Sequence, residues 1–195
     1  GTGCFIMLNT GESLVNSNNG LITTLACDYL GRSSYALEGT VFNAGSSVQW
    51  LRDGLGIINS AQETEGLANS IHDTGGIYMV PAFNGLGSPY WDTNAKGLIV
   101  GITRGTEKKQ IVRAALESIA FQSADLIQAM LKDSNTSFNS LHVDGGASAN
   151  NFLMQFQADI LSMPISRPLV LETTALGVGM LAGLTIGVWD HSDLE

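Results

Sequence analysis

The apolar positions of the first part of the chain form the short runs typical of β-strands, whereas later segments show helical spacing. Three strands are predicted at residues 4–9, 21–27 and 34–39, separated by turns rich in glycine, asparagine and serine. Because the links between them are of hairpin length, we expect an antiparallel meander in which each strand pairs with the next.

Helical spacing begins near residue 42. One helix is predicted over residues 42–55, where glycines interrupt the pattern. A second helix is predicted over residues 60–71, because Ser60 is followed three residues later by Glu63, which is the spacing of a capping box.

Strands and helices alternate along the rest of the chain. Strands are predicted at residues 77–80, 98–102 and 141–143 and at Ile165, and helices at residues 107–131, 151–161 and 174–187. Three strands, a helix and then repeated strand–helix units indicate an α/β fold with a mixed sheet and helices on both faces. No linker or repeat interrupts the pattern, so we predict one domain over residues 1–195.

Composition narrows the classes of function. The formal net charge is −9, from 18 acidic and 9 scattered basic residues, which argues against a nucleic-acid surface. It does not argue against a nucleotide, because backbone N–H groups and Mg²⁺ can hold phosphates. No apolar run is long enough for a membrane helix. Cys4 and Cys27 are predicted to be buried thiols, which fits a reducing compartment such as the cytoplasm.

The start of the chain is unusual. There is no initiator Met, and Gly1 lies directly before a predicted strand. We therefore expect this chain to be a fragment of a longer protein.

Common catalytic and phosphate-binding signatures do not occur. No Gly-Lys-Ser/Thr sequence is found, which excludes a P-loop. The three histidines lie far apart and lack metal-site spacing, so neither a metal site nor a catalytic triad is predicted.

Two adjacent glycines have the most informative local context. Gly145 and Gly146 stand between a predicted strand that ends at Asp144 and a predicted helix that Asn150 or Asn151 could cap. This places free N–H groups and the positive end of a helix dipole beside bare backbone. The residues alone leave two interpretations open, a simple turn or contact with a ligand.

Two other segments carry weaker signals. Gly1, Thr2 and Gly3 form a small corner whose amides and hydroxyl suit phosphate oxygens. The loop at residues 84–92 places Tyr90 and Trp91 beside an aspartate. Its aromatic side chains either line a ligand or an interface, or pack within the loop itself.

Taken together, several motifs resemble the glycerol kinases, a branch of the FGGY carbohydrate kinase family. They are GTGCF at 1–5, YALEG at 35–39, QWLRD at 49–53, VPAFNGLGSPYWD at 80–92 and DGGASANNF at 144–152. Residues 97–117 follow the signature of the wider family, and the PYWD sequence favours glycerol kinases over the pentose and gluconate kinases.

The resemblance implies the C-terminal domain of a two-domain actin-like ATPase, which is a ribonuclease H-like fold of order βββαβαβα. It also implies a nucleotide site, in which Thr2 contacts the phosphates. Gly45 and Gln49 belong to the same site. Gly146 and Asn150 hold the adenosine end, and Gly145 makes the turn.

The same resemblance implies ATP-dependent phosphorylation of glycerol to sn-glycerol 3-phosphate, with Mg²⁺ as cofactor and Phe5 packed against the carbon skeleton of glycerol. The catalytic aspartate would lie upstream of Gly1, so no catalytic residue or metal ligand is assigned here. The implied partners are ATP, ADP, glycerol and the N-terminal domain, in a cytoplasmic homo-oligomer that binds neither nucleic acid nor membrane. We expect the chain alone to be inactive.

Three alternatives remain open from the sequence. One is another FGGY kinase that acts on a larger polyol. Another is a non-catalytic actin-like module that binds nucleotide, and the third is a domain whose glycines are only structural.

Overall fold

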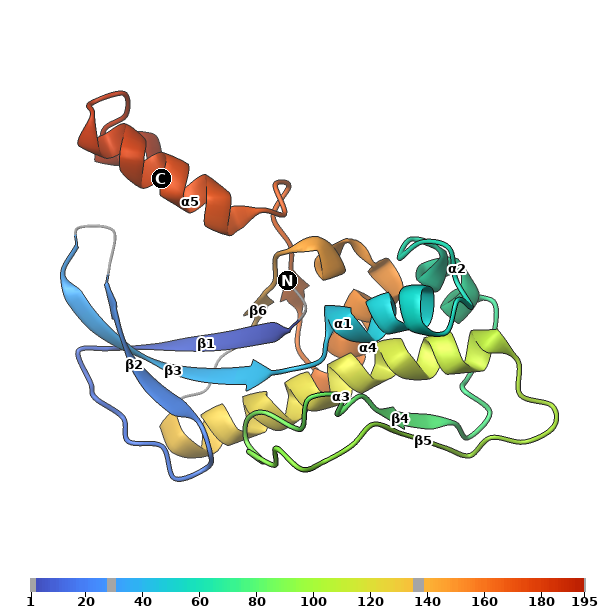
Figure 1. Ribbon diagram of the computed structural model, residues 1–195. Coiled ribbons are helices and arrows are strands. Elements are labelled where there is room, and N and C mark those ends of the chain that lie inside the picture. Colours follow the sequence, from blue (N-terminus) through green and yellow to red (C-terminus); the bar gives the residue numbers. More distant parts are fainter. Residues whose placement is uncertain (1–2, 28–30, 135–138, 195) are drawn as a thin grey trace.

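The computed structural model describes residues 3–27, 31–134 and 139–194. Three strands, β1 (Cys4–Gly11), β2 (Ile22–Cys27) and β3 (Ser33–Val41), form an antiparallel sheet beside the long helix α3 (Lys108–Ser134) (Figure 1). All four elements lie where the sequence pattern predicts them. Thr2 falls outside the described residues.

The predicted meander is wrong, because β3 lies in the middle of the sheet and pairs with both β1 and β2. The segment between β1 and β2 does not turn back as a hairpin. It crosses to the end of α3, where the Asp133 carboxylate accepts hydrogen bonds from the Ser17 hydroxyl (2.6 Å) and the Asn18 backbone N–H (3.0 Å). This anchor holds β2 away from β1 and leaves the place beside β1 to β3.

One face of the sheet packs on α3. Ile6, Leu37 and Val41 are buried in one apolar cluster with Leu126 of α3. Side chains of a strand alternate between its two faces, so the residues next to Ile6 point the other way. Phe5 is accordingly 66% exposed on the face of the sheet that does not contact α3.

Two short helices follow the sheet. Helix α1 (Gly45–Gln49) continues into a π-helical turn (Trp50–Gly54), as the pattern predicts. Helix α2 (Glu63–Asn69) begins later than predicted, and Ser60 is not its N-cap. The residues before it form turns instead, and the Glu63 carboxylate accepts a hydrogen bond from the Asn59 backbone N–H at 2.9 Å.

The remaining strands pair in two small sheets. Strands β4 (Tyr78–Val80) and β5 (Leu98–Val100) are antiparallel, while β6 (Leu141–His142) and β7 (Ile165–Ser166) are parallel. The α/β class and the element order are thus as predicted. The described strands nevertheless form three separate sheets and not one mixed sheet, because β4 and β5 pack on a second apolar cluster with the first half of α3.

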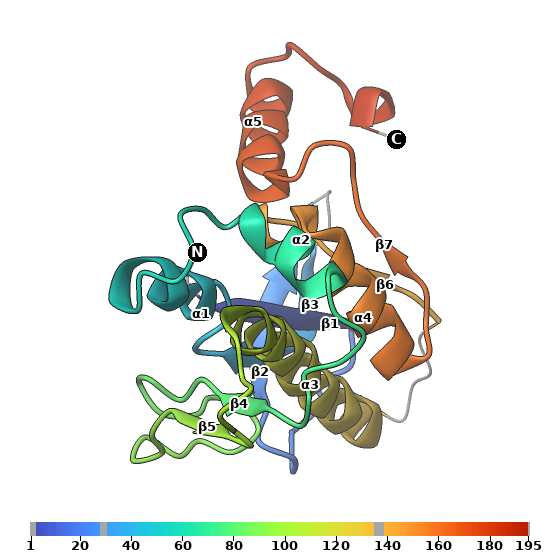
Figure 2. The same ribbon diagram turned by 90° about the vertical axis from the view of Figure 1, so that its right-hand side faces the viewer.

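Two helices complete the chain. Helix α4 (Asn151–Leu161) packs on α3, and α5 (Thr173–Thr185) stands away from the rest of the domain in both views (Figures 1 and 2). A short 3₁₀ turn, His191–Leu194, ends the described chain. Among the described helices, none has the length and apolar character needed to cross a membrane.

The two cysteines differ. Cys4 is partly buried, and burial raises the pKa of its thiol. Cys27 is exposed, so its predicted burial is wrong. It lies at the end of β2, which pairs with β3 at the edge of the sheet formed by the described strands.

Candidate functional site

A cavity of about 680 Å³ opens between α1, α2 and the turn that precedes α4. Leu116 and Ile119 of α3 contribute to its lining. Four predicted site residues that are far apart in the sequence line this one cavity: Gly45, Gln49, Gly146 and Asn150.

The first side of the cavity is the helix α1. Gly45 begins this helix and Gln49 ends it. Residues four positions apart lie on the same face of a helix, so both face the cavity together. The Gln49 side chain is exposed and therefore free to meet a ligand.

The opposite side is the turn that contains the two glycines. Gly145 has a φ of +77°, a conformation that glycine adopts without strain, and its N–H donates to the Leu171 carbonyl at 2.7 Å. Gly146 begins a 3₁₀ turn, Gly146–Ala149, and a Cβ built on it would meet no atom within 4 Å. Gly145 therefore makes the turn, as predicted, whereas Gly146 borders open space.

Asn150 has two structural partners. Its Oδ1 accepts a hydrogen bond from the Leu153 N–H at 3.0 Å and so caps α4. Its Nδ2 donates to the Thr64 hydroxyl on α2, also at 3.0 Å. Of the two asparagines that could cap this helix, Asn150 is the one that does.

Asn151 makes a second connection to α2. Its backbone N–H and its Nδ2 donate to the two carboxylate oxygens of Glu65, at 2.8 and 3.0 Å. Arg167 reinforces the turn from the other side, donating to the Ser148 carbonyl and to Asn151 Oδ1. Thr64 and Glu65 also line the cavity, and the sequence reasoning did not identify them.

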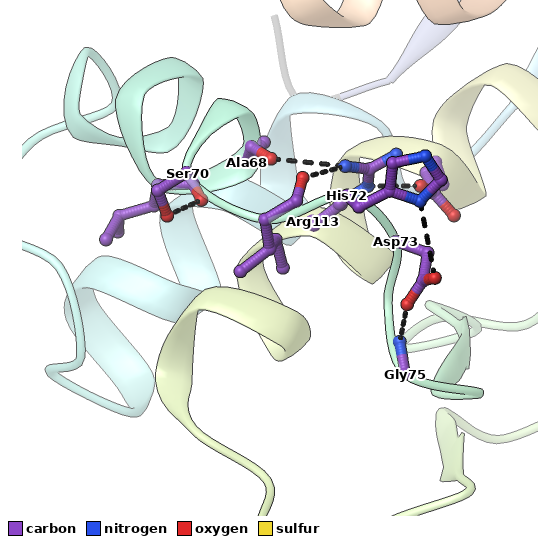
Figure 3. A network of polar contacts seen from close by, with 9 residues as sticks. Ala68, Ser70, His72, Asp73, Gly75 and Arg113 are labelled. Carbon is purple, nitrogen blue, oxygen red and sulfur yellow. Dashed lines mark hydrogen bonds and ion pairs between the residues drawn. The ribbon is translucent and has the colours of Figure 1, made fainter.

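The other end of α2 is fixed by Arg113. Its guanidinium donates to the carbonyls of Ala68 and Ile71 (Figure 3) and forms an ion pair with Glu117 at 2.7 Å. It also lies 4.9 Å from the centre of the Phe152 ring on α4. The ion pair lies within α3 and fixes the guanidinium, whose bonds to Ala68 and Ile71 join the end of α2 to α3 and whose contact with Phe152 adds α4.

The segment after α2 is more exposed. Asp73 accepts a hydrogen bond from the Gly75 N–H at 2.8 Å and faces His72 (Figure 3). The Gly75 bond, with His72 as the second partner, lowers the pKa of the Asp73 carboxyl. Neither residue lines the cavity.

Phe5 is the described site residue that does not line the cavity. It projects from the outer face of β1, where it is exposed. The described structure therefore brings together the four residues predicted to bind nucleotide and leaves Phe5 on a separate surface.

The aromatic loop at residues 84–92 packs on its own domain. The Tyr90 hydroxyl donates to Asp125 at 2.8 Å, and Trp91 Nε1 donates to the Gly20 carbonyl at 2.7 Å. The bond to Asp125, together with some burial, raises the pKa of Tyr90 to about 12. Both bonds reach residues outside the loop, so its aromatic side chains are anchored on the rest of the domain and do not bond within the loop itself as one interpretation predicted.

Acidic and histidine side chains do not gather in the described part of the chain. Within residues 3–27, 31–134 and 139–194, no group of three or more His, Cys, Asp or Glu residues could hold a metal ion.

Residues 1–186 match the C-terminal domain of the FGGY family of carbohydrate kinases. Among curated proteins, the chain is 58% identical to a glycerol kinase of Shewanella woodyi over 98% of its length. It is 59% identical to glycerol kinase 2 of Thermotoga maritima over 99% of its length. In both comparisons the chain spans 39% of the relative.

Solved structures give the same picture. A glycerol kinase of Plasmodium falciparum with ADP superposes with a TM-score of 0.86 at 39% identity, over 99% of this chain and 38% of that one. A ligand-bound xylulose kinase of Lactobacillus acidophilus superposes with a TM-score of 0.78 at 26% identity, over 97% of this chain and 38% of that one.

Proposed function

The chain belongs to the FGGY family of carbohydrate kinases, and from this premise we propose that residues 1–195 are the C-terminal, nucleotide-binding domain of a glycerol kinase. The whole protein transfers the γ-phosphoryl group of ATP to glycerol and releases sn-glycerol 3-phosphate and ADP. The observation that carries the proposal is the convergence of Gly45, Gln49, Gly146 and Asn150 on one cavity. The identity of 58–59% to proteins named glycerol kinase supports the choice of substrate.

Each of these residues has a suitable property for holding a nucleotide. Gly146 lets a ligand approach the backbone, because no side chain stands in the way. Asn150 uses one N–H for Thr64 and keeps the other as a donor. Gln49 offers an exposed amide from the facing helix.

Two further residues belong to the proposal. Thr2 contacts the phosphates from the start of the chain. Phe5 supplies an exposed apolar surface for the carbon skeleton of glycerol.

Phosphoryl transfer needs a group that accepts the hydroxyl proton and cations that balance the charge on the phosphates. We assign the base to the part of the protein beyond this chain, because no aspartate here matches the family's catalytic position. The described residues do not form a protein-built Mg²⁺ site. Mg²⁺ in proteins is commonly bound through substrate phosphates, so we propose that it enters with ATP.

The test is a steady-state assay of the whole protein with ATP. We expect glycerol-dependent release of ADP, with little turnover of xylulose or gluconate, and no turnover by the 195-residue chain alone. Preferential phosphorylation of xylulose or gluconate would instead make the protein another FGGY kinase. Nucleotide binding without turnover of any polyol would favour the non-catalytic module.

Two properties of the whole protein are part of the same proposal. Both cysteines are free thiols, which fits a reducing compartment, and we place the enzyme in the cytoplasm. We also predict that the whole protein is a homo-oligomer, which sedimentation analysis would measure.

A further inference from the structure

We propose that Thr64 and Glu65, two consecutive residues of α2, are positioning residues that set the orientation of the nucleotide-binding turn. This inference rests on the proposed function and deepens it. Neither residue resembles a nucleotide ligand in the sequence, and both contact the turn at residues that are 86 positions away.

Thr64 fixes the orientation of the Asn150 side-chain amide, that is, which of Oδ1 and Nδ2 faces it. The Thr64 hydroxyl has a single hydrogen, which it donates to the Ala61 carbonyl at 2.6 Å. Towards Asn150 it can therefore only accept, so it must face the NH₂ end of that amide. Thr64 is 1% exposed, so no water can replace this contact.

The orientation has a consequence for the ligand. With Nδ2 directed at Thr64, Oδ1 is left to cap α4, and it does so through the Leu153 N–H. The side chain then has one N–H that is still unused. A ligand atom that bonds to this unused N–H must consequently be a hydrogen-bond acceptor, such as a ring nitrogen or a ribose oxygen of the nucleotide.

Glu65 holds Asn151, the residue after Asn150, by accepting hydrogen bonds from it. An ionised carboxylate only accepts hydrogen bonds, and its two oxygens receive the backbone N–H and the side-chain N–H of Asn151. Asn151 Oδ1 is then left to accept from Arg167. Two neighbouring residues of α2 thus hold the N-cap and the first residue of α4, directly after the turn.

Helix α2 can act as such a support because it is fixed elsewhere. Arg113 binds the carbonyls at its end and connects it to α3 and α4 (Figure 3). In Figure 2, α2 lies beside α4, and the contacts between the two helices agree with this view. The cavity therefore has walls whose spacing depends on the bonds of Thr64 and Glu65.

The test compares four variants of the whole enzyme by steady-state kinetics and by ADP titration. Thr64→Val keeps the shape of the side chain and removes the hydroxyl, so we expect the KM for ATP to rise about five- to tenfold. The kcat and the KM for glycerol should stay within about twofold, and Thr64→Ser should restore the KM for ATP. Glu65→Gln should raise the KM for ATP less, because Glu65 is only partly buried and water can replace part of the lost hydrogen bonding.

Glu63→Gln is the matched control. Glu63 lies on the same helix and binds the Asn59 N–H, but it does not line the cavity. Its substitution should leave the KM for ATP unchanged. An equal rise for Glu63→Gln and Thr64→Val would mean that the effect is general damage to α2, and would overturn the proposal.

A double-mutant cycle asks whether Thr64 acts through Asn150. If it does, Thr64→Val should add little to the effect of Asn150→Ala, whereas independent effects would multiply. Multiplicative effects would refute the inference, as would a folded Thr64→Val enzyme with the parent KM for ATP; both leave the proposed function intact. A parent enzyme that binds no ADP would refute the inference and the proposed function together.

Discussion

The two glycine-rich loops of this domain look alike in the sequence but use their glycines for opposite purposes. In the aromatic loop at residues 84–92, a Cβ on Gly85 would lie 2.6 Å from the Asp92 carbonyl oxygen, and one on Gly87 would lie 2.2 Å from that of Thr40. In the turn before α4, a Cβ on Gly145 or Gly146 would meet nothing within 4 Å. The first pair is needed because the protein packs against itself, whereas Gly146 borders a space that a ligand can fill.

The partners of the polar residues show the same difference. Tyr90 and Trp91 of the aromatic loop make hydrogen bonds to Asp125 and to the Gly20 carbonyl. The Asn150 side chain makes two hydrogen bonds within the protein and keeps one donor for a ligand. Substitutions in the first loop should therefore change stability, and those in the second should change nucleotide binding.

The largest effect is expected from Gly87→Ala. The new Cβ would overlap a backbone oxygen of β3, which cannot move without disturbing the central strand. We expect the free energy of unfolding to fall by about 3 kcal/mol or more, measured by denaturant unfolding. Gly146→Ala is the control and should change it by less than about 1 kcal/mol; equal losses in both variants would remove the distinction between the loops.

Gly146→Val should give the reverse result. Its side chain would project into the cavity and meet the nucleotide, so we expect the KM for ATP to rise about tenfold or more. The unfolding transition should change little. Unaltered ATP kinetics in a folded Gly146→Val enzyme would show that the nucleotide does not lie against this residue.

A smaller effect is expected from Tyr90→Phe, which removes only the hydrogen bond to Asp125. The free energy of unfolding should fall by about 1 kcal/mol, with no change in the KM for ATP. A change in the KM without a loss of stability would indicate that the aromatic loop takes part in binding.

The smallest effect concerns Asp133, which anchors the segment that Trp91 contacts, and it should appear when the pH is lowered. Partial burial opposes its charge, but hydrogen bonds from Ser17, Asn19 and Asn18 outweigh burial and lower the pKa of the Asp133 carboxyl. A lowered pKa in the folded state stabilises the fold above the unfolded value of about 3.9, and this contribution is lost as the pH falls through the folded value. Thermal unfolding should show that the melting temperature falls less between pH 6 and pH 3 for Asp133→Asn than for the parent.

Features set by interactions between residues close in the sequence could be predicted, whereas those set by contacts between distant residues could not. The bounds of α4 were predicted residue for residue, because its cap and the preceding glycines are local signals. The pairing of β2 with β3 was also predicted, but the partner of β1 was not, since that pairing depends on where a distant anchor such as Asp133 holds the chain. The later start of α2 shows that capping-box spacing alone does not fix a helix end.

The candidate site divides in the same way. Gly45, Gln49, Gly146 and Asn150 were predicted through a family resemblance, and the fold brings them together. Thr64 and Glu65 were missed because side-chain bonds across 86 residues leave no periodicity or spacing in the sequence. Such supporting residues are visible only once the three-dimensional structure places them beside the site.

The most direct test of the central claim is a crystal structure of the whole protein with ADP. We predict that the adenosine part lies in the cavity between α1, α2 and the turn at Gly146, with an acceptor atom within hydrogen-bond distance of Asn150 Nδ2. An adenosine bound elsewhere on the molecule, with this cavity empty, would contradict the account.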